Sequence, residues 1–274
     1  MHSHREVDAA LGGIERFAYR IGRTLNESER GKRWSMAWGN YIAQPGLALT
    51  IRPRLHLEGG EHLPGRSLIL AANHRTFFDL FAVLIATWDL YPEPPFLYCP
   101  VRSGFFYEKP LGSLLNLLVS GYAMYPPIFR DERGPVLNRS AVDACVRLLE
   151  WNPRVIVAMH PEGTRNQTDD AYALLPAKPG IGRIALRSRA PVLPVFVNGL
   201  PRTFGRLLEE RFTAGIEPVR VLIGPPVGLD DLYDRADEPE AHREAAHRTV
   251  EAIRAGGERD RAFMADWRAR SAPA

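Results

Sequence analysis

Six short apolar runs, several of them β-branched, constrain the fold of this chain more than any other feature. They cover residues 54–58, 67–72, 96–101, 154–159, 192–197 and 219–223. Most lack the polar–apolar alternation of a half-exposed strand, so we expect strands that are covered on both faces. Helix-like segments separate these runs, and 139–150 is the clearest, with Asn138 as its expected cap. The pattern predicts an α/β fold with a largely parallel central sheet flanked by helices.

The chain divides into three zones by this pattern. Residues 1–53 form an N-terminal helical segment, 54–230 the main domain, and 231–274 a charged C-terminal helical tail in which Gly256-Gly257 is expected to separate two helices. Apolar residues at three- and four-residue spacing mark the first zone: Leu11, Ile14, Phe17, Ala18 and Ile21. This stripe fits either a helix on a membrane surface or a helix packed on the domain.

Composition excludes several classes of protein. With 274 residues, 45% hydrophobic and 24% charged, the chain is long enough for one full core and is ordinary in composition for a globular protein. Its two cysteines, Cys99 and Cys145, are part of neither a CxxC motif nor a His/Cys cluster. We therefore expect no disulfide scaffold, no metal site and a reducing compartment.

The charge of +3 is small but unevenly placed. Between Lys178 and Arg206 there are six cations and no acid, which suits an anionic ligand, a lipid surface or simply solvent. Nucleic acid is not expected as a partner, because no recognised binding motif accompanies this charge. We expect no secretory signal, since acids occur early in the chain. The charge-free stretches Trp34–Ile51 and Leu111–Phe129 are interrupted, so they favour a surface-bound helix over a membrane span.

Polar residues gather where two of the expected strands end, at Asn73–Asp79 and, 88 positions later, at Pro161–Arg165. The ends of strands are where open α/β sheets place their chemistry. His74 and Asp79 are five apart, so they would diverge in a continuous helix but can meet if His74 lies in the turn before it. Thr76 is then the expected cap, and Asp79 orients His74 as a base. The alternative is a capped helix with a histidine in an ordinary turn.

The second group suits an anion. Gly163 permits a tight backbone turn, and Arg165 can hold a phosphate through two parallel hydrogen bonds. Glu162 would accept a hydrogen bond from an acceptor hydroxyl or orient Arg165, and the plain alternative is a turn with a local Glu–Arg pair. Lys178 precedes a helix expected over 181–188, whose N–H groups favour an anion. His160 is expected to be packed or to support the site rather than to act as a second base.

In order and spacing these residues resemble the glycerolipid acyltransferase family, typified by bacterial 1-acylglycerol-3-phosphate acyltransferases. Four blocks carry the resemblance: Asn73–Asp79 (NHxxxxD), Tyr125–Arg130, Glu162–Arg165 (EGTR) and Val192–Val195. They cover roughly residues 54–230. The sequence departs from the family pattern at Tyr125-Pro126-Pro127 before Arg130, at Asn166 in place of a common serine, and at His160 in place of a bulky apolar residue.

The resemblance implies transfer of a fatty acyl group from acyl-CoA or acyl carrier protein, as co-substrate and without a further cofactor, to a glycerolipid hydroxyl. His74 would be the general base, supported by Asp79. The acceptor phosphate would be bound by the residues of the second and third blocks and the lysine: Arg130, Glu162, Gly163, Thr164, Arg165 and Lys178. It also implies a peripheral or monotopic protein at the cytoplasmic face of the membrane, with a lysophospholipid as acceptor.

Other functions stay open at this stage. The acceptor is 1-acylglycerol 3-phosphate on the favoured hypothesis, and glycerol 3-phosphate or a lysolipid without phosphate on the alternatives. A non-catalytic lipid-binding protein on the same scaffold would not need His74 and Asp79, and a hydrolase would use water in place of the acceptor alcohol. Acyl-chain length and oligomeric state have no signature in the sequence.

Overall fold

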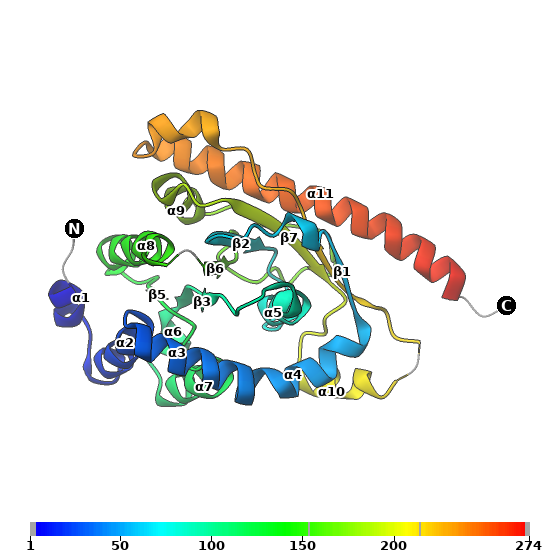
Figure 1. Cartoon of the computed structure of the whole chain (residues 1–274), viewed down its shortest axis with the longest axis horizontal. Coiled ribbons are helices and arrows are strands. Elements are labelled where there is room, and N and C mark those ends of the chain that lie inside the picture. The colour runs from blue at the N-terminus through cyan, green and yellow to red at the C-terminus, as the bar shows by residue number, and fades with distance from the viewer. Residues whose placement is uncertain (1–3, 153, 214, 272–274) are drawn as a thin grey trace. The chain divides into compact units, whose positions relative to one another are not determined.

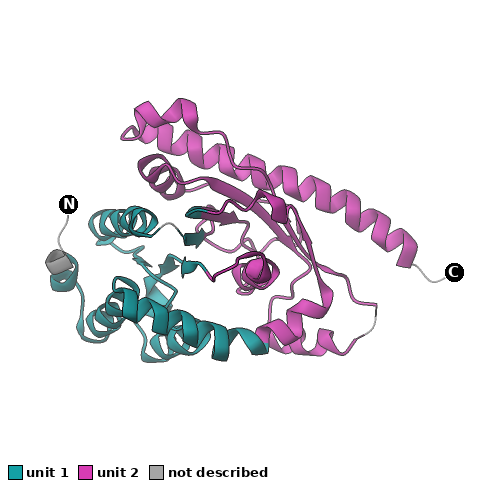
Figure 2. Cartoon of the chain, in the orientation of Figure 1, with its two compact units in different colours: residues 1–46, 66–68, 95–158 teal, residues 47–65, 69–94, 159–274 magenta. Residues whose placement is uncertain are grey.

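The computed structural model describes residues 4–152, 154–213 and 215–271, so the outermost three residues of the expected N- and C-terminal zones lie outside it. Its contacts divide the chain into two compact units (Figures 1 and 2). Unit 1 comprises residues 1–46, 66–68 and 95–158, and unit 2 comprises 47–65, 69–94 and 159–274. The expected α/β class with a largely parallel sheet flanked by helices is confirmed.

Four strands in unit 2 lie in the order β1 (Leu55–Glu58), β8 (Val219–Ile223), β7 (Val192–Asn198) and β2 (Leu68–Ala72). β1 pairs with β8 in parallel and β2 with β7 in parallel, whereas β7 and β8 are antiparallel. β2 and β8 are buried along their whole length. Burial on both faces accounts for the continuous apolar runs that predicted these strands.

The helices of unit 2 cover both faces of these strands. Figure 1 shows α5 (Asp79–Thr87) on one face, and α9 (Gly180–Ser188) and α11 (Pro239–Ser271) on the other. The shorter helical elements are α10 (Phe204–Arg211), α4 (Gln44–Ile51, at the unit boundary) and 3₁₀ turns at Arg52–Arg54, Gly60–His62, Trp88–Leu90 and Asp230–Arg235. Since β2 and β7 both lead towards the start of α5, this part of unit 2 holds the first group of polar residues.

The expected break of the C-terminal helix at Gly256-Gly257 is wrong, because α11 runs through both glycines. A Cβ at either position would lie 3.0 Å from an atom of the Phe196 side chain on β7. The glycines therefore allow α11 to pack closely on the sheet, and this contact outweighs their weak helix propensity.

Unit 1 contains two pairs of short parallel strands, β3 (Phe96–Tyr98) with β6 (Val155–Met159) and β4 (Val101–Arg102) with β5 (Pro127–Ile128). Its helices are α1 (His4–Ala10), α2 (Gly13–Asn26), α3 (Glu29–Trp38), a π-helical turn (Gly39–Ala43), α6 (Ser103–Phe106), α7 (Pro110–Ser120) and α8 (Gly134–Trp151). The strand expected at 154–159 and the helices expected at the N-terminus are therefore confirmed. The single strand expected over 96–101 is instead divided into β3 and β4, which belong to different sheets. No helix among the described residues is both long and apolar enough to cross a membrane.

Asn138 does not cap α8, which begins four residues earlier. Its side chain instead accepts a hydrogen bond from the N–H of Phe129 and donates one to the Phe129 carbonyl. The expected cap is wrong because this amide has a long-range use: it fixes the backbone just after β5 against the first turn of α8.

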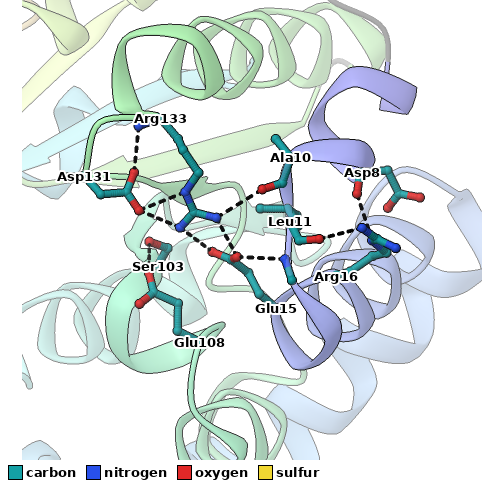
Figure 3. A network of polar contacts seen from close by, with 10 residues as sticks. Asp8, Ala10, Leu11, Glu15, Arg16, Ser103, Glu108, Asp131 and Arg133 are labelled. Atoms are coloured by element: carbon teal, nitrogen blue, oxygen red, sulfur yellow. Dashed lines mark hydrogen bonds and ion pairs between the residues drawn. The ribbon is translucent and has the colours of Figure 1, made fainter.

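The α2 helix is attached to unit 1 through a polar network rather than through its apolar stripe alone (Figure 3). Arg133 donates to both carboxylate oxygens of Glu15, at 2.7 and 3.1 Å, and to Asp131 at 2.9 Å. Ile14 and Phe17 of the expected stripe are exposed, at 48% and 65%. The N-terminal helices are thus packed on unit 1 and still present apolar side chains to solvent.

Candidate active site

The side chain of Asn73 extends the hydrogen bonding of the sheet beyond the end of β2. Its amide nitrogen donates to the carbonyl of Val197 at 3.0 Å, and its amide oxygen accepts from the Val197 N–H at 2.7 Å. An amide side chain has one donor and one acceptor group, so it can pair with a strand as a backbone unit does. Asn73 thereby fixes the beginning of the turn that carries His74.

His74 and Asp79 are brought together as predicted. The Nδ1 atom of His74 lies 3.2 Å from Oδ2 of Asp79. A carboxylate accepts hydrogen bonds only, so Nδ1 carries the hydrogen and Nε2 is the unprotonated nitrogen of the ring. Asp79 is buried, whereas 21% of the His74 side chain is exposed. The pair thus has a fixed tautomer and a partly accessible base.

The same carboxylate organises the whole turn. Asp79 accepts hydrogen bonds from the N–H groups of Arg75 and Thr76, at 2.7 and 2.8 Å, and from the Thr76 hydroxyl at 2.8 Å. α5 begins at Asp79, with Phe78 at the N-cap position, so the expectation that Thr76 is the cap is wrong. The Thr76 hydroxyl accepts from the Phe78 N–H within the turn that precedes the helix.

Glu162 joins the two groups of polar residues. One carboxylate oxygen accepts from the N–H of His74 and the other from the N–H of Leu175, both at 2.7 Å. Glu162 is buried, and this burial raises the pKa of its carboxyl group, although the two donated hydrogen bonds act in the opposite direction. The carboxylate holds the backbone of His74, so the alternative of a local Glu–Arg pair does not describe it.

The turn after Glu162 has the backbone that its sequence predicts. Gly163 has a φ of +68°, in the left-handed region that favours glycine, and its N–H donates to the carbonyl of His160. Thr164 and Arg165 follow and are exposed. Among the described residues no acid pairs with the guanidinium of Arg165. The turn therefore presents a cation that is available to an anionic ligand.

The segment after this turn is held against the first group by backbone contacts. The N–H of Asn166 donates to the carbonyl of His74 at 2.7 Å, and that of Lys178 donates to the carbonyl of Pro161 at 2.8 Å. The Lys178 side chain is exposed. All of the predicted site residues of unit 2 thus belong to two turns and one connecting segment, linked by hydrogen bonds.

Arg130 belongs to unit 1, where it follows β5. Burial and the nearby charge of Arg102 lower the pKa of its guanidinium. The other predicted phosphate-binding residues belong to unit 2, so the role of Arg130 in binding the acceptor phosphate stays a prediction.

His160 lies against the base. Its ring and that of His74 are stacked, with centroids 3.7 Å apart and planes 7° from parallel. Together with Asp79 the two histidines place possible metal ligands within 4.8 Å of one another. Stacked rings suit a metal poorly, however, because an ion in the plane of one ring lies well outside the plane of the other. The Oδ2 atom of Asp79 already lies within hydrogen-bond distance of three groups, Nδ1 of His74 and the N–H groups of Arg75 and Thr76.

Comparison with known proteins identifies the family. The family profile described as Acyltransferase matches residues 54–198, just over half of the chain. The chain belongs to the acyltransferase family. It is 26% identical over 188 residues to proteins named 1-acyl-sn-glycerol-3-phosphate acyltransferase from Limnanthes douglasii and Limnanthes alba. The match covers 67% of this chain and 58% of each relative, so the chain spans less than two thirds of the length of these relatives.

Among solved structures, the chain is similar to the 1-acyl-sn-glycerophosphate (LPA) acyltransferase PlsC from Thermotoga maritima. That match has a TM-score of 0.47 and 19% sequence identity, and it covers 96% of this chain and 84% of the other.

Two arginines that hold the site together had no role in the sequence-based predictions. Arg75 donates to the carbonyls of Asp170 and Thr168, at 2.6 and 2.8 Å, and Arg202 donates to the same Thr168 carbonyl at 2.7 Å. Arginines that bind backbone carbonyls have no sequence signature. By contrast, Asn73 begins the first group and Asn166 directly follows the second. Their bridging hydrogen bonds could have been predicted, because an amide side chain both donates and accepts.

Proposed function

We propose that this acyltransferase moves a fatty acyl group from a thioester, acyl-CoA or acyl carrier protein, to the hydroxyl of a lysophospholipid, with 1-acylglycerol 3-phosphate as the favoured acceptor. One observation carries the proposal: a His–Asp pair is joined by hydrogen bonds to an exposed Gly–Thr–Arg turn. The names of the Limnanthes relatives support the choice of acceptor.

In this reaction His74 acts as a general base. Its Nε2 removes the proton of the acceptor hydroxyl as the oxygen attacks the thioester carbonyl. Collapse of the tetrahedral intermediate breaks the C–S bond, and the imidazolium returns the proton to the departing thiolate, so that an ester and a free thiol result. The Asp79 carboxylate stabilises the imidazolium that forms between these steps. A positioned base contributes about 10²–10⁴-fold to the rate.

The acceptor phosphate is bound by the exposed cations of the second group. The Arg165 guanidinium suits two parallel hydrogen bonds to phosphate oxygens, and the Lys178 ammonium suits a point contact. Gly163 and Thr164 shape the turn, while Glu162 acts through the backbone of His74 rather than on the ligand. Arg130 is a further candidate for this phosphate. Glycerol 3-phosphate has the same anionic group, so it is the alternative acceptor that this arrangement favours most.

We also propose that unit 1 binds the cytoplasmic face of the membrane peripherally. α3, the π-helical turn and α7 pack together, and Nε1 of Trp38 donates to the carbonyl of Leu118. Their surface contains exposed aromatic and aliphatic residues: Trp34, Tyr41, Ile42, Leu111, Leu114 and Leu118. All six belong to stretches without a charged residue, 34–51 and 111–129. Aromatic and aliphatic side chains exposed on such helices favour a lipid interface.

Binding to vesicles tests this part of the proposal. We expect Tyr41→Ser combined with Leu111→Ser to reduce co-sedimentation with anionic lipid vesicles. Val136→Ser, which changes another exposed apolar residue, on α8, is the control and should bind as the wild type does. Equal binding by all three proteins would contradict the assignment of this surface.

A thiol-release assay with long-chain acyl-CoA, with and without 1-acylglycerol 3-phosphate, tests the reaction. We expect release that depends on the acceptor and is lost in His74→Ala. The control is His247→Ala, which removes an exposed histidine of α11 in the same unit. Release without acceptor would indicate hydrolysis, and activity retained in His74→Ala would refute the assignment of the base. If acyl-CoA gives no release, acyl carrier protein is the donor to test next.

A further inference from the structure

The imidazole of His160 is placed on the face of the proposed catalytic base. His160 follows β6 directly and precedes the turn that contains Glu162, and its ring is stacked on that of His74 at a centroid distance of 3.7 Å. Nothing in the acyl transfer itself uses this second histidine. Its position calls for a separate explanation, because a polar ring stacked on a base restricts both the orientation of the base and its solvation.

His160 is itself fixed by the backbone. Its Nδ1 lies 3.0 Å from the carbonyl oxygen of Ala72, the last residue of β2. Since a carbonyl only accepts, Nδ1 carries the hydrogen and the tautomer of His160 is set. The ring is therefore attached to the strand from which the His74 turn begins, and it is a rigid surface rather than a mobile side chain.

We infer that His160 is a positioning residue for His74. The base is held at its edge by Asp79, through Nδ1, and on its face by the His160 ring. The first contact fixes the tautomer, and the second limits rotation of the imidazole about its bond to Cβ. Together they fix the direction of Nε2, which must point at the acceptor hydroxyl. A misplacement of about 1 Å in such a group can reduce the rate about 10²-fold.

Three substitutions separate the stacked ring from the volume that it fills. His160→Phe retains an aromatic face, His160→Leu retains volume without a ring, and His160→Ala removes both. The inference rests on the proposed function. We expect kcat for acyl transfer to fall about 10–100-fold in His160→Leu and His160→Ala, with KM for the acceptor nearly unchanged, and to stay close to the wild-type value in His160→Phe.

Proton NMR of the His74 ring measures the stacking itself, while the split between kcat and KM and the rescue by His160→Phe separate a positioning role from a purely structural one. A stacked aromatic ring shifts the carbon-bound ring protons of His74 upfield, and His74→Ala identifies these signals by their loss. We expect the upfield shift to persist in His160→Phe and to disappear in His160→Leu. Because His160→Leu and His160→Phe both fill the site, a failure of His160→Ala to fold does not remove the test.

His242 provides the matched control. It is a buried histidine of unit 2 and, like His160, has a ring nitrogen in contact with a backbone carbonyl, that of Ala236 at 2.7 Å. His242→Leu should leave kcat per folded molecule and the His74 signals unchanged. A wild-type kcat in His160→Leu, with the His74 signals still at their wild-type upfield positions, would overturn this inference and leave the proposed function intact. An absence of acyl transfer by the wild type with every donor and acceptor tested would instead overturn the proposed function.

Discussion

His160 should make the stability of this protein fall in mild acid. Burial, together with the adjacent charge of His74, lowers the pKa of the His160 imidazole to about 3, from 6.5 in an unfolded chain. Between these values the unfolded state binds a proton that the folded state does not. The contribution to stability is therefore fully present above pH 6.5 and is lost as the pH falls from 6.5 towards 3.

The size of the effect follows from the unfolded-state pKa. At pH 5 an unfolded histidine gains about 2 kcal/mol from protonation relative to pH 7, and the folded state gains almost nothing if its pKa is near 3. The His160 side chain is only half-buried, so solvent at its edge reduces the shift. The expected difference between pH 7 and pH 5 is therefore about 1.5–2 kcal/mol.

Urea unfolding of the wild type and His160→Phe at pH 7 and pH 5 measures this difference. The wild type should lose about 1.5–2 kcal/mol more than the variant over this interval, because other groups titrate equally in both proteins. His160→Leu should follow His160→Phe in this experiment, although the two differ in activity. Parallel losses in wild type and variants would refute the reasoning, since His160 would then titrate equally in the folded and unfolded states.

Two further predictions concern contacts that hold unit 2 together. Glu162→Gln keeps the shape of the side chain but leaves one of the N–H groups of His74 and Leu175 without its acceptor. We therefore expect the free energy of unfolding in urea to fall by about 2 kcal/mol, and kcat to fall with little change in KM. An unchanged kcat would contradict a role of Glu162 in holding His74. Gly182→Ala would place a Cβ 2.0 Å from the carbonyl oxygen of His242. We expect the free energy of unfolding in urea to fall by about 1–3 kcal/mol despite the better helix propensity of alanine, with kcat per folded molecule unchanged. Wild-type stability would show that α9 and α11 can separate without cost.

The strands and most of the helices were predictable because their signals are local. A strand that is buried on both faces must be apolar along its length, as β2 and β8 are. Predictions failed where a residue is used by a distant part of the chain. Asn138 is of a residue type that often caps helices, but its side chain binds the backbone of Phe129. The two glycines of α11 lie against Phe196 and do not form a turn. Local propensity does not contain these contacts, since they depend on packing between elements.

The residue types of the site were predictable from the sequence, but the contacts that each residue makes were not. The spacing of His74 and Asp79 predicted that they can meet if His74 lies in the turn before the helix, and the structure has this arrangement. Glu162 was expected near the ligand or Arg165, yet both of its oxygens accept from backbone N–H groups. A carboxylate has the same sequence signature in either role. Which role it takes depends on where the N–H groups of a segment 88 positions away lie.

The contacts of the two carboxylates determine which charges the site exposes to solvent. The carboxylates of Asp79 and Glu162 are buried, and their oxygens are occupied by hydrogen bonds from the surrounding turns. In the part of the chain that the structure describes, no acid pairs with Arg165 or Lys178, which are exposed beyond these turns. The negative charges are therefore used inside the protein to hold the turn that contains His74, while the positive charges of Arg165 and Lys178 lie at the surface. The proposed acceptor, with a phosphate next to its reactive hydroxyl, fits this separation. Its phosphate would meet the cations Arg165 and Lys178, and its hydroxyl would meet the unprotonated nitrogen of His74.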